Sequence, residues 1–203
     1  MNSTITAPDG LERCRWCAAV PEFLDYHDHE WGFPVVDDRR LFEKLCLESF
    51  QSGLSWRTIL AKRAHFRAAF CDFDFERIAR FDAADVERLL QDKGIIRHRG
   101  KIEAVINNAC RAQDIVAEQG SLAAFLWRFE PSQEALDEPQ TVSSSPASVA
   151  LSRALKQRGW KFVGPTTIYA FMQAMGLIND HAVACVVRAK VEEARSALRR
   201  PVI

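Results

Sequence analysis

The sequence contains no long apolar run, and no segment approaches the roughly 18 consecutive apolar residues that a membrane-spanning helix needs. Its six cysteines are irregularly spaced, unlike the disulfide framework of a small secreted protein. No secretory signal peptide, internal repeat or low-complexity tract is visible. We therefore expect a protein with no membrane partner that works in a reducing cytoplasm.

Net charge is also absent, because 27 lysines and arginines balance 27 aspartates and glutamates. Zero net charge argues against a nucleic-acid partner, but the charges are unevenly distributed. Acidic residues gather in 72–92 and 130–138, whereas cations gather in 97–101, 153–161 and the C-terminal tail. A polarised neutral protein can still present a phosphate-binding face. Ordinary solvated helix faces are the alternative interpretation.

Helical spacing of apolar residues dominates the chain and predicts an all-α fold. With 203 residues, 48% of them apolar, we expect a disordered leader over residues 1–11 and one compact helical domain of two packed lobes over residues 12–203. The expected helices cover 41–50, 59–70, 82–90, 102–116, 122–129, 146–158, 165–175 and 183–198. Their expected N-caps are Asp37 or Asp38, Asp82, Ser121 and Ser145.

Two pairs of metal-binding side chains lie near opposite ends of the chain: Cys14 with His27, and His181 with Cys185. The second pair is four residues apart, so on a helix both side chains would emerge on one face. Zinc favours a tetrahedral set of thiolates and imidazoles, and a closed set of four ligands is structural. The sequence thus predicts a structural zinc that joins the two termini. Ordinary buried thiols and histidines are the alternative.

One glycine turn resembles an anion site. Residues 161–169 follow one expected helix and open another, so unpaired backbone N–H groups are available at a helix N-terminus. With Arg158 and Lys161 beside it, this segment fits the helix–hairpin–helix manner of gripping a DNA phosphate. A simple helix–helix corner, with Gly164 in an unusual backbone conformation, is the alternative.

Glu48 falls on the apolar face of the helix expected over residues 41–50. A buried glutamate is costly unless it is paired or used, although a position at the edge of the apolar face would let it reach solvent. Four large rings lie in the same part of the chain and could form a slot for a flat, cationic base, or simply a tryptophan-rich core. These rings are Trp16, Tyr26, Trp31 and Trp56.

Taken together, these residues lie in segments that resemble the bacterial 3-methyladenine DNA glycosylase I family over about residues 12–186. The segments are RCRW (13–16), YHDHEWG (26–32), CLE (46–48), QSGLSW (51–56), GIIRHRGK (94–101), FVG (162–164), FMQA (171–174) and GLINDH (176–181). The resemblance implies an all-α member of the helix–hairpin–helix DNA glycosylase superfamily. Such a protein flips 3-methyladenine out of alkylated double-stranded DNA and hydrolyses its N-glycosidic bond, which leaves an abasic site.

The resemblance also implies residue roles. The structural zinc ligands are Cys14, His27, His181 and Cys185, and the catalytic carboxylate that bonds the base is Glu48. Tyr26 and Trp56 stack on the base, with Trp16 and Trp31 nearby. DNA contacts fall on Gly53 and on Leu54, which fills the space left by the flipped base, and on a turn with Lys161, Gly164 and Thr166. The chain is expected to act as a monomer and not to cleave the DNA strand.

The chain also departs from the family pattern. Ser49 stands where glycine is common, and Phe50 stands where a small or polar residue is common, so Phe50 could narrow the base pocket or the DNA-facing surface and thereby change the range of substrates. His29 and Cys17 are possible alternative metal ligands. Asp180 could have a catalytic role, or a capping role beside the metal.

Two other functions are compatible with these residues. One is a non-catalytic sensor of damaged DNA. The other is a zinc hydrolase, which would need an open position on the metal.

Overall fold

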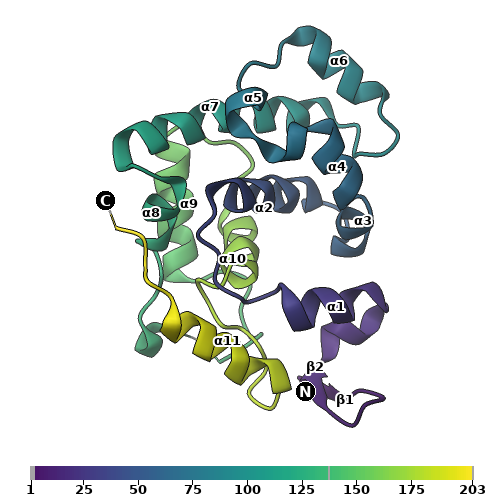
Figure 1. The fold of residues 1–203 in the computed structure, drawn as a ribbon, viewed down its shortest axis with the longest axis vertical. Helices are drawn as coiled ribbons and strands as arrows, with labels where there is room; N and C mark the ends of the chain where they lie inside the picture. Colours follow the sequence, from purple (N-terminus) through teal and green to yellow (C-terminus); the bar gives the residue numbers. More distant parts are fainter. Residues whose placement is uncertain (1–2, 137, 203) are drawn as a thin grey trace.

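The computed structural model describes residues 3–136 and 138–202, and this part of the chain is mostly helical (Figure 1). The helices are α1 (Glu22–His29), α2 (Asp38–Gln51), α3 (Trp56–Ala61), α4 (Arg63–Ala69), α5 (Phe75–Ile78), α6 (Ala83–Gln91), α7 (Arg99–Gln119), α8 (Leu122–Trp127), α9 (Pro146–Gln157), α10 (Pro165–Ala174) and α11 (Val186–Ala197). Three short 3-10 helices are η1 (Arg15–Ala19), η2 (Cys71–Phe73) and η3 (Gln133–Ala135), and the two strands are β1 (Thr4–Thr6) and β2 (Glu12–Cys14).

Four helices begin at the capping side chains that the sequence predicts. The side chains of Asp37 and Ser121 accept hydrogen bonds from the first turns of α2 and α8. Asp82 and Ser145 form capping boxes at α6 and α9, and Pro146 occupies the first position of α9, where a missing N–H is harmless. These predicted helix starts are therefore confirmed.

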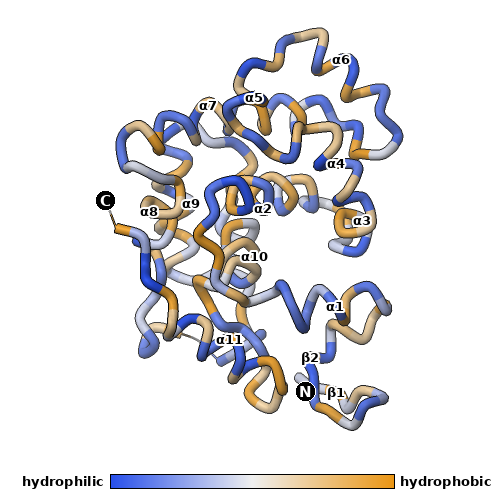
Figure 2. The backbone as a smooth tube through the Cα atoms, viewed as in Figure 1, coloured by the Kyte–Doolittle hydropathy of each residue, from blue (hydrophilic) through white to orange (hydrophobic). Residues whose placement is uncertain are grey.

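Helix α2 runs through the middle of the molecule and packs against α3, α7, α8 and α10 (Figure 1). At one end of the molecule lie α4, α5 and α6, and at the other lie α1, α11 and the two strands. Figure 2 shows that the central helix α10 is largely apolar, whereas α6 at the periphery alternates between hydrophilic and hydrophobic residues. The core is rich in phenylalanine, and its fully buried rings include Phe42, Phe50, Phe66, Phe70, Phe73 and Phe171.

The C-terminal end of α2 is held by a buried cation. Lys101 Nζ donates to the carbonyl oxygens of Phe50 at 2.8 Å and Ser52 at 2.5 Å. A positive charge stabilises a helix C-terminus because it satisfies free carbonyl groups and opposes the helix dipole. Lys101 thereby fixes the start of the turn that joins α2 to α3.

The first strand contradicts the expected disordered leader over the residues that the structure describes. β1 pairs antiparallel with β2, with Thr4 opposite Cys14, and Gly10 (φ +80°) lies in the connecting turn. Residues 1–2 lie outside the described residues. A polar strand of three residues has no alternating apolar pattern, so only its pairing with β2 reveals it. The described chain is otherwise mostly helical, as predicted, and these two short strands are its departure from an all-helical architecture.

Two expected helices also differ. The helix expected over residues 59–70 breaks at Lys62 (φ −99°, ψ 0°) into α3 and α4. The last helix starts at Val186 rather than at 183, and Cys185 is its N-cap. Apolar spacing can continue across a break in the backbone, as it does at Lys62, whereas Val183 lies before the last helix and is 74% exposed. Among the described residues, no helix is both long and apolar enough to cross a membrane.

Candidate functional site

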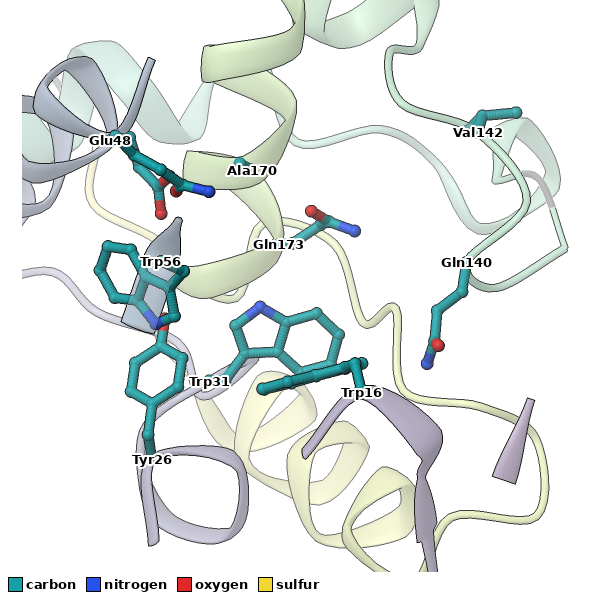
Figure 3. Close-up of a pocket in the computed structure, with 10 residues that line it drawn as sticks. Trp16, Tyr26, Trp31, Glu48, Trp56, Gln140, Val142, Ala170 and Gln173 are labelled. Atoms are coloured by element: carbon teal, nitrogen blue, oxygen red, sulfur yellow. The ribbon is translucent and has the colours of Figure 1, made fainter. Parts of the chain in front are cut away.

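A cavity of about 340 Å³ opens between α1, α2, α3 and α10 (Figure 3). Its volume is within the range of small-molecule sites. All five residues expected around the base line it: Trp16, Tyr26, Trp31, Glu48 and Trp56. Its other lining residues are Gln51, Gln140, Val142, Ala170 and Gln173.

The four rings come from separate segments that meet at the cavity. Trp16 on η1 and Trp31 after α1 meet edge to face, with ring centres 5.0 Å apart. Tyr26 on α1 and Trp56 on α3 are tilted, with ring centres 5.4 Å apart. Such pairs suit ring quadrupoles and leave aromatic faces available to a flat ligand. The rings therefore form cavity walls rather than a closed tryptophan-rich core.

Glu48 points into this cavity from α2, and the residue is only 6% exposed (Figure 3). Its Oε1 atom lies 2.8 Å from Nζ of Lys44, one turn earlier on the same helix. Both side chains are almost entirely buried. The carboxylate is thus paired inside the protein, which offsets part of its desolvation cost.

Lys44 is a component of the site that sequence reasoning missed. Its Nζ also donates to the Tyr26 hydroxyl at 2.8 Å and lies 3.4 Å from the centre of the Trp56 ring. Burial lowers the pKa of Lys44 although Glu48 opposes this shift, and burial raises the pKa of Tyr26 well above its usual value. The available signal was the i, i+4 spacing of Lys44 and Glu48, which places both on one helix face.

Asp180 supports the cavity from outside. Its carboxylate accepts from the side chain of Gln173 at 2.5 Å and from the backbone N–H of Gln140 at 3.0 Å. Burial raises the pKa of Asp180. Gln173 and Gln140 line the cavity whereas Asp180 does not, so Asp180 holds two wall residues in place.

The four predicted metal ligands converge in a second, buried site. Their ligand atoms all lie within 4.8 Å of one another, and every one of the four residues is buried. The Sγ atom of Cys185 is 3.5 Å from His27 Nε2 and 3.6 Å from His181 Nδ1, and Cys14 Sγ is 3.7 Å from His181 Nδ1. Adjacent sulfur and nitrogen ligands of a tetrahedral zinc would be about 3.5 Å apart, given the usual bond lengths. The donor set therefore fits such an ion.

Hydrogen bonds to neighbouring groups also orient three of these side chains. His27 Nδ1 lies 2.7 Å from Asp28 Oδ1, and His181 Nε2 lies 3.0 Å from the Trp31 carbonyl oxygen. Cys14 Sγ accepts from the side chain of Gln140 at 3.1 Å. Partners of this kind fix the orientation of metal-binding imidazoles and thiolates.

The backbone conformation that brings His181 and Cys185 together is not the expected helix. His181 and Cys185 lie in a turn before α11, not on a helix face, so the helical explanation of their spacing is wrong. The alternative ligands stay outside the group: His29 is exposed and bonds Asp25, and Cys17 is buried but not part of the cluster.

The turn between α2 and α3 presents an exposed apolar side chain. Gly53 adopts φ +80°, and Leu54 is 42% exposed. Ser55 then caps α3. This arrangement holds Leu54 outward between two fixed helices, close in sequence to the cavity residues Gln51 and Trp56.

The predicted phosphate-binding turn lies between α9 and α10. Asn108 on α7 fixes it, because its side chain exchanges two hydrogen bonds with the Lys161 backbone at 2.8 and 3.0 Å. Gly164 has an ordinary φ of −64°, so it does not supply the unusual conformation suggested by the alternative interpretation. Instead, the residues with positive φ are Gly159 and Phe162.

The two departures from the family pattern lie outside the cavity. Phe50 is fully buried, with its ring centre 4.6 Å from that of Phe66. The hypothesis that it narrows the pocket is therefore wrong, because its position on α2 faces the α4 side of the core. Ser49 is buried and donates to the carbonyl oxygens of Leu45 and Phe162, which ties α2 to the α9–α10 turn.

A ring-walled cavity with one buried carboxylate in a mostly helical chain is the arrangement that the resemblance implied, and comparison with known proteins assigns its class. The chain belongs to the methyladenine glycosylase family, whose sequence model matches residues 16–189. The predicted family is thus confirmed.

Among individual relatives, the chain is 51% identical to DNA-3-methyladenine glycosylase 1 of Escherichia coli (strain K12) over 180 residues, which cover 86% of this chain and 96% of that protein. It is 44% identical to DNA-3-methyladenine glycosylase of Haemophilus influenzae over 178 residues, 85% of this chain and 96% of the relative. A crystal structure of 3-methyladenine DNA glycosylase I matches with a TM-score of 0.81 and 50% identity, covering 86% of this chain and 98% of the other. A variant of such an enzyme in complex with 3-methyladenine also matches with a TM-score of 0.81, at 36% identity over 87% of this chain and 97% of the other.

Proposed function

We propose that this protein removes 3-methyladenine from alkylated double-stranded DNA by hydrolysing the N-glycosidic bond, which leaves an abasic site. The observation that carries this function is Glu48, a buried carboxylate in a cavity walled by Trp16, Tyr26, Trp31 and Trp56. Relatives that share about half of the sequence are DNA-3-methyladenine glycosylases.

The chemistry suits a site without a strong general acid. Methylation at N3 makes the base cationic while it is attached to the sugar. When the bond between C1′ and N9 breaks, its electron pair goes to the base, which leaves as a neutral molecule. Water then adds to the sugar cation at C1′ and loses a proton. The protein's main task is therefore to extrude the nucleotide and hold only a base that fits.

We infer that Glu48 selects the base through a hydrogen bond and that the rings select it by stacking on its flat faces. An ionised carboxylate accepts strongly from the exocyclic amine of an adenine ring. Tyr26 and Trp56 would stack on the base, with Trp16 and Trp31 closing the cavity beside it. None of the described residues that line the cavity is a lysine that could attack C1′, so an intact abasic strand is the expected product.

We propose zinc as the ion held by Cys14, His27, His181 and Cys185. Two thiols and two imidazoles at tetrahedral spacing support zinc, and four protein ligands leave no open position for a catalytic water. The ion would therefore stabilise the fold, and the donor set argues against a zinc hydrolase. Free cysteines throughout the described chain suit a reducing cytoplasm.

DNA would be held by two turns. We propose that α9, α10 and the turn between them form the helix–hairpin–helix unit that grips a phosphate, with Gly164, Thr166 and Lys161 at the contact. A Cβ atom added at Gly164 would meet nothing within 4 Å, so packing within the protein does not require glycine there. Close approach of a DNA backbone would. Leu54, on its glycine turn, would fill the gap left by the flipped base.

The decisive experiment is a product analysis with the full-length, metal-containing protein. Duplex DNA treated with a methylating agent is incubated with the protein, and released bases are separated by chromatography. We expect 3-methyladenine to appear together with intact strands carrying abasic sites, from a protein that works as a monomer. Tight binding to abasic DNA with no released base would instead identify a damage sensor.

A further inference from the structure

We propose that Lys44 is a positioning residue that pairs with Glu48, and that by offsetting the charge of Glu48 it weakens the preference of the cavity for a cationic base over a neutral one. The inference rests on the proposed function, because it concerns the same cavity. It assigns to Lys44 a specificity role in addition to its place in the fold.

The ammonium group of Lys44 has three close neighbours: Glu48, Tyr26 and Trp56. Its Nζ atom lies 2.8 Å from Glu48 Oε1 and 2.8 Å from the Tyr26 hydroxyl. The Trp56 ring centre lies 3.4 Å from the same nitrogen, which is the geometry of a close cation–π contact. Lys44 therefore contacts the carboxylate and two of the rings assigned to the base.

Lys44 approaches these groups from behind the cavity wall. Tyr26 and Trp56 line both the main cavity and a small second void, whereas Lys44 lines only the second. One side of the Trp56 ring is thus already occupied by a cation before any ligand binds. A second cation on the opposite side gains less from that ring than it would from a ring with no charge behind it.

The other charges around the second void are mostly paired with each other. Arg63 donates to both carboxylate oxygens of Glu30 at 2.5 and 2.8 Å, and Arg67 donates to Glu43 at 2.8 Å. Arg40 also lines this void. Glu48 is the charged residue that lines the base cavity among the described residues, and it is paired with Lys44 behind the wall, so the pair is neutral as a whole.

This pairing lowers the net charge that a bound base meets. Lys44 Nζ and Glu48 Oε1 lie 2.8 Å apart and both side chains are almost entirely buried, so little water screens the ammonium from a base beside Glu48. The ammonium repels a cationic base, so the net attraction between the cavity and a positive charge is weaker than a lone carboxylate would give.

The test measures equilibrium binding to two ligands that differ in charge. Neutral 3-methyladenine and the permanently cationic 3,9-dimethyladeninium are titrated at pH 8, with tryptophan fluorescence as the signal. For Lys44→Met, we expect the affinity ratio of cation to neutral base to rise about tenfold relative to the wild type. Lys44→Arg retains the charge and is expected to keep a ratio close to the wild-type value.

A purely structural role for Lys44 would lower both affinities equally in Lys44→Met and leave their ratio unchanged. That result would overturn the inference.

Two controls keep the outcomes separate. Lys44→Gln replaces the charge with a neutral donor, so it reports on the same charge effect if the methionine variant does not fold. Zinc content and melting temperature of each variant show whether the fold is intact. If the wild type releases no 3-methyladenine, the proposed function fails. If the wild type is active and neither neutral variant changes the ratio, only the role of Lys44 fails.

Discussion

A single carboxylate carries the polar recognition in the proposed site. Glu48 is buried on α2 among rings, and its charge is offset by Lys44 one turn away. Burial of an ion pair is costly, and removal of one partner leaves the other charge unpaired. The carboxylate of this pair lines the cavity, where it is within reach of a ligand.

We predict that Glu48→Gln lowers the rate of 3-methyladenine release by about 10- to 100-fold, because a hydrogen bond to a charged group contributes roughly 1.5–3 kcal/mol. Release of the base from methylated duplex DNA is the measurement. Glu43→Gln is the matched control, since Glu43 lies on the same helix, pairs with Arg67 and does not line the main cavity. Equal activity of the Glu48 variant and the wild type would contradict the role of the carboxylate.

At the scale of an element, the α9–α10 turn contains two glycines, and the structural reason for glycine differs between the two positions. Gly159 adopts φ +81°, a left-handed conformation that glycine adopts most easily. Gly164 has an ordinary φ and open space at its Cβ position. Glycine at 159 is therefore explained by the fold, whereas neither the φ angle nor the packing at 164 requires glycine, and we attribute this glycine to the proposed phosphate contact.

This contrast gives a matched pair of variants. Gly164→Val is expected to lower the melting temperature by only a few degrees, because valine is a poorer N-cap of α10 than glycine. It is expected to raise the KM for methylated duplex DNA, while free 3-methyladenine binds as in the wild type. Gly159→Val is expected to lower stability by about 1–2 kcal/mol through backbone strain. Thermal unfolding and excision kinetics separate the two effects. Unimpaired DNA processing by a folded Gly164→Val protein would refute the proposed phosphate contact.

At the scale of the whole molecule, the four-ligand cluster connects segments from both ends of the chain. Cys14 ends β2 and His27 lies on α1, whereas His181 and Cys185 precede α11. A metal that closes so long a loop stabilises the folded state, because the unfolded chain lacks a preformed site. The same cluster lies beside Gln140 and Trp31 of the cavity wall, so the ion would also steady the pocket.

We therefore predict that Cys185→Ser loses zinc and lowers the melting temperature by about 10 °C, as expected for a loss of several kcal/mol in a chain of this size. Metal analysis and calorimetry provide the two readouts. Cys17→Ser is the control, because Cys17 is a buried cysteine outside the cluster. One equivalent of zinc in the Cys185 variant would show that a different ligand set holds the ion.

The sequence by itself determined the helix starts that have a capping side chain, the family, and the predicted residues that line the cavity or form the four-ligand cluster. Capping side chains such as Asp37 and Ser145 act within a few residues of the chain, and apolar spacing reports directly on the buried face of a helix. The roles of Cys14, Glu48 and Trp56 could be predicted from the sequence because few residue types can bind zinc, accept a hydrogen bond as a carboxylate or stack on a base.

Only the tertiary structure decided how those pieces face one another. In the folded protein β1 pairs with β2, and His181 and Cys185 lie in a turn. Phe50 lies in the core, and Lys44 lies behind Tyr26 and Trp56. Each of these outcomes depends on contacts between segments that are distant in the chain or on which side of a helix meets a neighbour. Local propensity carries little information about such contacts, because their free energy arises only when the segments are packed together.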